Sequence, residues 1–303
     1  MKVLLAQGFC VGIGGGISYI PALTMISTSF TTKRPIAIGI ASIGSSVGAV
    51  IFPVMFRQLQ PRIGFPWAVR SIGFVTLLMA IIACANSCRQ PVLKTRARSL
   101  IDWTAFREVP FMLFSVSLTC VMLAYYVPIF YVASYARTVI HTTTSLSFYM
   151  VAIVNGTSVV GRVVPYLLVA YVKPITIVIV GVAGSAIAMF TWIAVSNIPG
   201  FIVWACYWGS LSGILVTGPT SIVAHPVFWP DVKYTGTRLG MMWGISSFGA
   251  LAGTPVAGAL VNLHTADFLH AQVFSGCVMV GAVLLQLWPA WKVLQYDRSH
   301  PRR

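Results

Sequence analysis

Long stretches without a charged side chain constrain this sequence more than any other feature. No Asp, Glu, Lys or Arg occurs at residues 3–32, 35–56 or 174–230. About 20 consecutive apolar residues are enough for an α-helix to cross the hydrocarbon core of a bilayer. Charged residues make up 8% of the 303 residues, against about 25% in soluble domains. The sequence therefore predicts an all-α, polytopic membrane protein.

Polar breaks between the apolar runs predict about nine transmembrane helices. The segment SNIPG supplies turn residues that divide the longest run in two. Residues 87–108, the longest polar segment, are interpreted as a cytoplasmic linker between a partial N-terminal half of three helices (1–86) and a C-terminal six-helix half (109–291). A basic cytoplasmic tail is predicted at 292–303. The predicted spans are residues 3–28, 35–56, 65–86, 109–133, 145–170, 175–195, 201–223, 239–262 and 269–291.

The distribution of basic residues predicts an orientation. Fourteen of the 20 Lys and Arg residues fall in the loops and tail on the side of the C-terminus, and four fall on the other side. Cytoplasmic loops carry the excess of positive charge in membrane proteins. We therefore expect the N-terminus outside, the C-terminus in the cytoplasm and the plasma membrane as the location. This topology accounts for the net charge of +15, so the lipid bilayer is a predicted partner and nucleic acid is not.

Glycines crowd the start of the chain in the segment GFCVGIGGGISYIPA. A dinucleotide-binding loop needs a small residue where this chain has Ile17 or Tyr19, and an acidic residue about 20 positions later. The first acidic residue is Asp102, so the sequence does not support a nucleotide site. Small residues spaced by four let membrane helices approach closely. We expect such packing, either static or as part of a transport gate, at Gly12, Gly16, Gly44 and Gly48.

Arg162 is the strongest candidate for a functional side chain. A charge near the centre of a bilayer costs about 2.5–3.5 kcal/mol and usually faces a cavity or a partner. Such a cation can hold a carboxylate substrate. The alternative is that Arg162 lies near the cytoplasmic end of its span and reaches the interface. Asn155 is the amide deep in the same span, and Tyr126 belongs to the cluster YYVPIFY, which lines a cavity or forms an interfacial belt.

The sequence offers no set of residues for catalysis or metal binding. Its six cysteines include no CxxC pair, and its five histidines are scattered through different loops. No paired carboxylates and no nucleophile with a base are found. No metal and no cofactor are therefore predicted, and an enzyme embedded in the membrane is retained only as an alternative.

Several segments resemble one known family. The stretch GIGGGISYIPALTMISTSFTTKRPIAIGIASIGSSVG is similar to the fourth and fifth helices of monocarboxylate-transporter-like members of the major facilitator superfamily, with their fungal branch closest. The segment NGTSVVGRVVP resembles helix eight, and YTGTRLGMMWGISSFGALAGTPVAGAL resembles helix eleven. The resemblance covers nearly the whole chain.

This resemblance implies a fold of twelve helices in two halves. The nine predicted spans then correspond to helices four to twelve, so an incomplete, N-terminally truncated fold is expected. The implied function is alternating-access transport of a small organic solute, such as a monocarboxylate or other organic anion. Arg162 would face the anion, with Asn155 and Tyr126 lining the site. Animal carboxylate carriers have an aspartate one turn before this arginine, where this chain has Ser158, so proton coupling through such a pair is not expected.

A second hypothesis stays open beside transport. A chain without the first three helices would be a non-transporting, truncated or degenerate membrane protein. The sequence predicts neither the identity of the solute nor an oligomeric state.

Overall fold

The computed structural model describes residues 8–30, 34–88, 99, 101–167, 171–222, 225–228, 235–263 and 265–300. These residues are almost entirely helical, with one isolated β-bridge between Asn262 and Asp267. The elements are α1 (Val11–Ser29), α2 (Arg34–Cys88), the 3₁₀ helix η2 (Trp103–Arg107), α3 (Val109–Thr138), α4 (Thr144–Leu167), α5 (Pro174–Ile193), α6 (Ile198–Ile222), α7 (Thr235–Leu260) and α8 (Leu269–Ser299).

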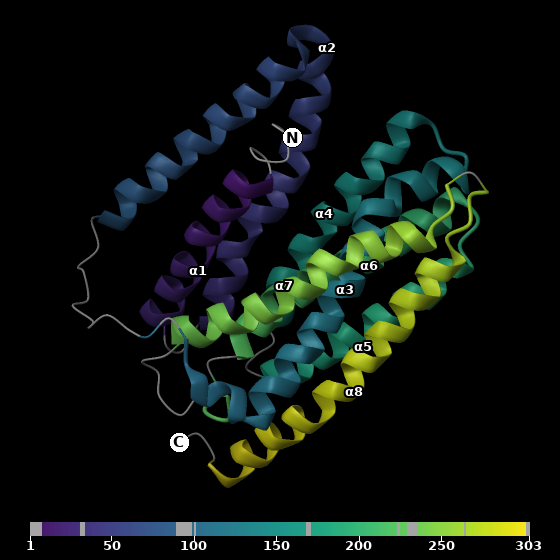
Figure 1. Cartoon of the computed structure of the whole chain (residues 1–303). Coiled ribbons are helices and arrows are strands. Elements are labelled where there is room, and N and C mark those ends of the chain that lie inside the picture. Colours follow the sequence, from purple (N-terminus) through teal and green to yellow (C-terminus); the bar gives the residue numbers. More distant parts are fainter. Residues whose placement is uncertain are drawn as a thin grey trace.

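Helix α2 is two helices joined at one residue. It has 55 residues, and Gly64 breaks it with φ 76° and ψ 165°. At 1.5 Å per residue an unbroken helix of this length would measure about 80 Å, far more than a bilayer core. A side chain is disfavoured at positive φ, so glycine is suited to this position. The sequence predicted a loop of eight residues, RQLQPRIG; the structure instead concentrates the break at Gly64, and α2 folds back on itself (Figure 1).

With α2 counted as two arms, the described helices number nine, as the sequence predicted. Seven of the eight helices, all except α7, are long and apolar enough to cross a membrane. Helix α3 continues five residues beyond the predicted end of its span, to Thr138. Helix α8 continues to Ser299, so the first part of the predicted basic tail is helical; residues 301–303 lie outside the described part of the chain. The predicted linker contributes η2, but its residues 89–98 and 100 lie outside that part as well.

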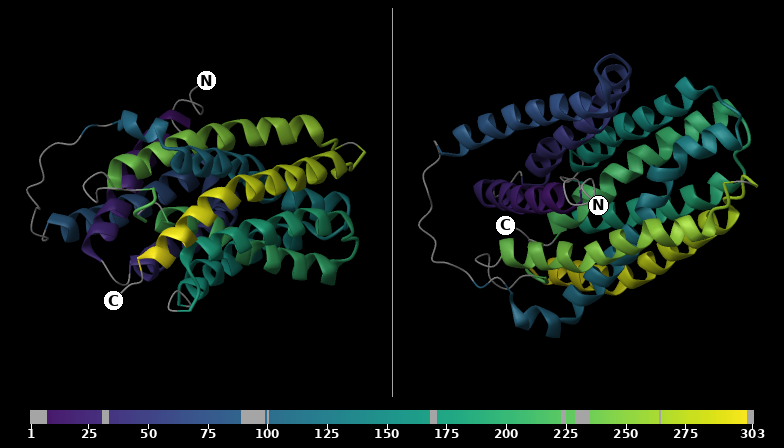
Figure 2. Two further views of the ribbon diagram at one scale, coloured as in Figure 1. Left: turned by 90° about the horizontal axis from the view of Figure 1, so that it is seen from below. Right: turned by 45° about the horizontal axis from the view of Figure 1, so that its top comes forward.

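Helices α3 to α8 form one bundle, and α1 and α2 lie along one side of it (Figures 1 and 2). Within the bundle, α3 packs on α7 and α8, and α5 packs on α6 and α8. The N-terminal part of the chain contacts the bundle at two places: α2 packs against α4, and α1 packs against α7. About half of the membrane-length windows of α3, α5 and α6 is buried, against 6% in α1 and α2. The core therefore sits among α3 to α8.

Glycines bring two pairs of bundle helices into backbone contact. A Cβ atom added at Gly161 of α4 would lie 1.6 Å from the carbonyl oxygen of Ser210 in α6, and one at Gly213 of α6 would lie 2.2 Å from that of Ser158. In α7, a Cβ at Gly249 would lie 2.0 Å from the carbonyl oxygen of Thr119 in α3. No larger residue fits at these positions, so close approach of small residues holds α4 on α6 and α3 on α7.

An aromatic cluster closes the end of the bundle where α5 connects to α6. Trp192 and Trp204 stack with ring centroids 4.8 Å apart, and Tyr135 meets Trp192 edge-on at 5.2 Å. The Tyr135 hydroxyl donates to the backbone oxygen of Val195 at 2.8 Å, and the indole Nε1 of Trp204 donates to that of Ala188 at 2.7 Å. These two polar groups are satisfied while their rings are buried. The indole Nε1 of Trp192 is buried without a hydrogen-bond partner among the described residues.

Candidate functional site

Arg162 lies in α4 against the first arm of α2. Arg162 is only 6% exposed. One terminal nitrogen, Nη1, donates to the backbone oxygen of Ser42 at 2.7 Å and also to the hydroxyl of Ser45. The Nε atom is buried and has no hydrogen-bond partner within the described residues. Arg162 is thus turned toward α2 and keeps unused donor capacity, which does not fit a side chain that only reaches for an interface.

A hydroxyl pair continues the same contact one turn along α4. The Oγ atoms of Ser158 and Ser46 lie 2.7 Å apart, and both residues are buried. The Ser158 hydroxyl also lies 2.6 Å from the backbone oxygen of Asn155. Ser158 therefore supplies a neutral group that links α4 to α2. The sequence identified Ser158 but gave no sign of its partner.

No carboxylate in the described part of the chain lies within ion-pair distance of Arg162. Tyr19 of α1 and Tyr125 of α3 lie within electrostatic range of the guanidinium. A buried cation without an anionic partner is costly. Within the described part of the chain, Arg162 therefore keeps an uncompensated charge and an unused Nε donor.

Tyr126 and Asn155 lie in the same region but differ in their surroundings. Tyr126 is half-buried, with its ring 5.1 Å from that of Tyr125 and 5.9 Å from that of Phe130. The amide nitrogen of Asn155, also half-buried, donates to the backbone oxygen of Val151 at 2.9 Å. Their predicted roles as site-lining residues stay predictions. Tyr125, which is buried, belongs to the predicted aromatic cluster, whereas Tyr19 was not predicted to line the site.

The glycines predicted as packing residues behave differently from those of the bundle. A Cβ atom at Gly12, Gly16 or Gly44 would meet nothing within 4 Å, and one at Gly48 would meet only Phe52 of its own helix. Their packing or gating role stays a prediction. Among the described residues, no group of three His, Cys, Asp or Glu side chains could hold a metal ion.

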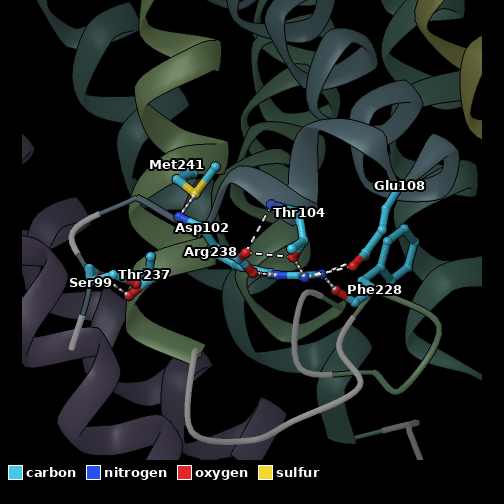
Figure 3. A network of polar contacts seen from close by, with 8 residues as sticks. All are labelled: Ser99, Asp102, Thr104, Glu108, Phe228, Thr237, Arg238 and Met241. Atoms are coloured by element: carbon cyan, nitrogen blue, oxygen red, sulfur yellow. Dashed lines mark hydrogen bonds and ion pairs between the residues drawn. The ribbon is translucent and has the colours of Figure 1, made fainter. Parts of the chain in front are cut away.

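A second polar network joins the linker to the bundle at the opposite end from the aromatic cluster. Arg238, at the start of α7, is 4% exposed. Its Nε donates to Asp102 at 2.8 Å, Nη2 to Glu108 at 2.6 Å, and Nη1 to the backbone oxygen of Phe228 at 2.7 Å (Figure 3). Asp102 also caps η2 by accepting from the backbone nitrogen of Thr104 at 3.0 Å. Arg238 thus connects α7 to the segment from Asp102 to Glu108 and to the segment that contains Phe228.

Hydrogen bonds and the nearby charge of Arg238 lower the pKa of Asp102. Partial burial by itself raises the pKa of Asp102, but hydrogen bonds from Thr104 and Arg238 and the positive charge of Arg238 outweigh it. The pKa of Asp102 therefore lies below its ordinary value, and the carboxylate is ionised at neutral pH. A third cluster holds the end of α8, where Asp297 contacts Lys173 at 2.8 Å and His225 at 2.9 Å.

Comparison with known proteins places these features in a family context. The family model of the Major Facilitator Superfamily matches residues 2–254. An MFS-type transporter of Emericella nidulans is 33% identical over 276 residues, which cover 91% of this chain and 62% of the relative. The aspyridones efflux protein of the same organism is 33% identical over 93% of this chain and 57% of its own length. The agnestins efflux protein of Paecilomyces divaricatus is 28% identical over 94% and 65%, respectively. The chain thus spans about three fifths of the length of the curated relatives it matches.

Proposed function

Since the chain belongs to the Major Facilitator Superfamily, we propose that it carries a small organic anion across a membrane by alternating access, with Arg162 as the anion-binding cation. The relatives are named as transporters, and two are named as efflux proteins, which supports outward transport and not an enzymatic reaction. A monocarboxylate is the simplest substrate of this class. The plasma membrane, with the C-terminus in the cytoplasm, is part of the same proposal because it rests on the positions of the basic residues.

The observation that carries this proposal is the state of Arg162. It is buried between α4 and α2, lacks a carboxylate partner within the described residues and has an unused Nε donor. Substrate sites of such transporters lie near the midplane between the two halves. In this proposal residues 1–86 and 109–291 belong to different halves, with 87–108 as the linker, so the α2–α4 contact is a contact between halves. The anion would replace the weak hydroxyl partners of Arg162 by a charge-assisted pair.

A counterflow assay on the 303-residue chain tests the proposal. The protein is reconstituted in liposomes loaded with unlabelled solute, and the uptake of labelled lactate, benzoate and their neutral amides is compared. We expect exchange of a carboxylate and none of its amide. The Arg162→Gln variant should lose at least about 30-fold in exchange rate, because truncating a buried charge partner costs about 2 kcal/mol or more. The exposed Arg137 at the end of α3 gives the control variant Arg137→Gln, which should exchange normally.

Two results would count against the proposal. Equal exchange by Arg162→Gln would remove the arginine from the site. Absence of exchange for every carboxylate, by a chain that is folded and inserted, would favour the alternative of a non-transporting membrane protein.

A further inference from the structure

A pocket of about 370 Å³ lies farther along the contact of α2 with α4, at a distance from Arg162. Its polar lining consists of Arg57 and Gln58 from α2 and Ser145 from α4, and its aromatic lining consists of Phe148 and Tyr149 from α4. Ser145 precedes Arg162 by 17 positions of α4, and Ala152, the α4 lining residue nearest to it in sequence, precedes it by ten. These separations correspond to about 25 Å and about 15 Å along the helix. The pocket is therefore a separate place from the site proposed above.

The contacts of Arg57 leave its charge without an opposite charge. Its Nη2 donates to the Ser145 hydroxyl at 3.0 Å, and its guanidinium carbon lies 4.8 Å from the centroid of the Phe148 ring. Within the described residues no carboxylate lies at ion-pair distance from it; the four acidic residues there pair with Arg238, His270, or Lys173 and His225. Both partners of Arg57 hold the guanidinium in place without neutralising it.

The pocket combines this fixed cation with apolar and aromatic surface. Small and branched apolar residues from both helices form the rest of its lining, and Phe148 and Tyr149 are exposed. An arginine presents a planar set of donors that matches a carboxylate or phosphate oxygen pair, and aromatic rings accept a flat or acyl body against their faces. A ligand that satisfies both surfaces needs an anionic head and an apolar or aromatic body.

We propose that the Arg57 pocket is a second binding site, which takes an amphipathic anion with its head on Arg57 and its body against Phe148. This goes beyond the proposed transport function, because binding there requires neither Arg162 nor movement of the solute across the membrane. Two sources supply this chemistry, a water-borne aryl carboxylate and an anionic lipid. The experiment therefore includes one arm for each source.

In the first arm, the 303-residue chain is placed in nanodiscs of phosphatidylcholine, and 2-naphthoate is titrated by its fluorescence. The Arg162→Gln background removes the other predicted anion site. We expect saturable binding in this background, weakened roughly ten-fold by Arg57→Gln, because a charge-assisted hydrogen bond is lost. Phe148→Leu should weaken binding by about three-fold through loss of the aromatic contact. The matched control is Arg70→Gln. Arg70 is also an exposed arginine of α2, and its guanidinium carbon lies 5.0 Å from the centroid of the Trp67 ring, but Arg70 does not line the pocket.

In the second arm, native mass spectrometry counts the phosphatidylglycerol molecules retained by the wild type, Arg57→Gln and Arg70→Gln. Loss of one retained lipid in Arg57→Gln alone supports the site with a lipid as its source. Binding of 2-naphthoate that depends on Arg57 supports it with a soluble anion as its source. If neither ligand responds to Arg57→Gln, the inference is wrong. If 2-naphthoate binding disappears with Arg162→Gln and is unchanged by Arg57→Gln, the second site fails while the proposed function stands.

Discussion

Replacing Arg238 by Met should destabilise the protein by about 3 kcal/mol. The side chain of Arg238 is 4% exposed. The substitution removes its hydrogen bonds to Asp102, Glu108 and the backbone oxygen of Phe228. Removing one partner of a buried ion pair costs about 3–5 kcal/mol, because the remaining charge stays buried. We take the lower end, because the side chains of Asp102 and Glu108 are 11% and 27% exposed and water can relieve part of the cost.

The assay is thermal unfolding of the purified chain in detergent, followed by tryptophan fluorescence. A loss of about 3 kcal/mol corresponds to a fall of about 6 °C in the midpoint, with about 2 °C per kcal/mol for a chain of this size. The exposed Arg137→Met should change stability by less than about 0.5 kcal/mol. The double variant Arg238→Met with Asp102→Asn should recover at least about 1 kcal/mol, because the two residues share one interaction.

The pH dependence of this difference follows from the lowered pKa of Asp102. A carboxyl whose pKa is lower in the folded state contributes stability that is present above its ordinary value of 3.8 and is lost as the pH falls below it toward the folded value. The gap between wild type and Arg238→Met should therefore be constant from pH 7 to pH 5 and should shrink below about pH 4. A midpoint unchanged by Arg238→Met, or strictly additive effects in the double variant, would refute the reasoning.

Three further predictions concern the glycine contacts, the aromatic cluster and the end of α8. Gly161→Ala should destabilise the α4–α6 contact strongly, because its Cβ atom would lie 1.6 Å from a backbone oxygen. In the control Gly156→Ala, in the same helix, the Cβ atom meets nothing within 4 Å, so this variant should be neutral or stabilised by up to about 1 kcal/mol. The thermal unfolding midpoints of the two variants are compared. Tyr135→Phe should cost about 1 kcal/mol in unfolding free energy, through loss of the bond to Val195, and an unchanged midpoint would contradict it. Asp297→Asn should speed proteolysis at the end of α8, since the charge that holds Lys173 disappears.

Much of the fold could be predicted because lipid leaves the backbone few choices. Charge-free runs of sufficient length become helices, and the predicted starts of several spans, such as that of α3, agree with the structure. The ends were less predictable. The chain between the arms of α2 contains Pro61 and charged residues, which favour a loop, yet it continues as helix up to Gly64. One glycine at positive φ was enough to reverse the chain.

Of the two helices that form the candidate site, the sequence predicted the contribution of α4 and not that of α2. Arg162 interrupts an apolar run with a charge. A charge within a membrane span is energetically costly, and this made Arg162 recognisable from the sequence. Its partners Ser42 and Ser45 are 120 and 117 residues away along the chain. Serines in membrane helices commonly bond to their own backbone, and no feature of a single sequence shows which helix they face. Arg238 was missed for a different reason, since at the edge of a predicted span it was counted only as a loop charge.

The glycine contacts between α4 and α6 determine how Arg162 can move. Because backbone meets backbone at Gly161 and Gly213, no flexible side chain lies between the helices to absorb sliding or rotation there. Arg162 directly follows Gly161 in α4. A displacement of Arg162 therefore requires α4 and α6 to move together. On the opposite side, α4 meets α2 through the hydrogen bonds of Arg162 and Ser158 to Ser42, Ser45 and Ser46. The hydrogen bond of Arg57 to Ser145 and apolar packing add to this contact. In the proposed transport cycle, α4 and α6 would therefore move together, away from Ser42, Ser45 and Ser46 of α2.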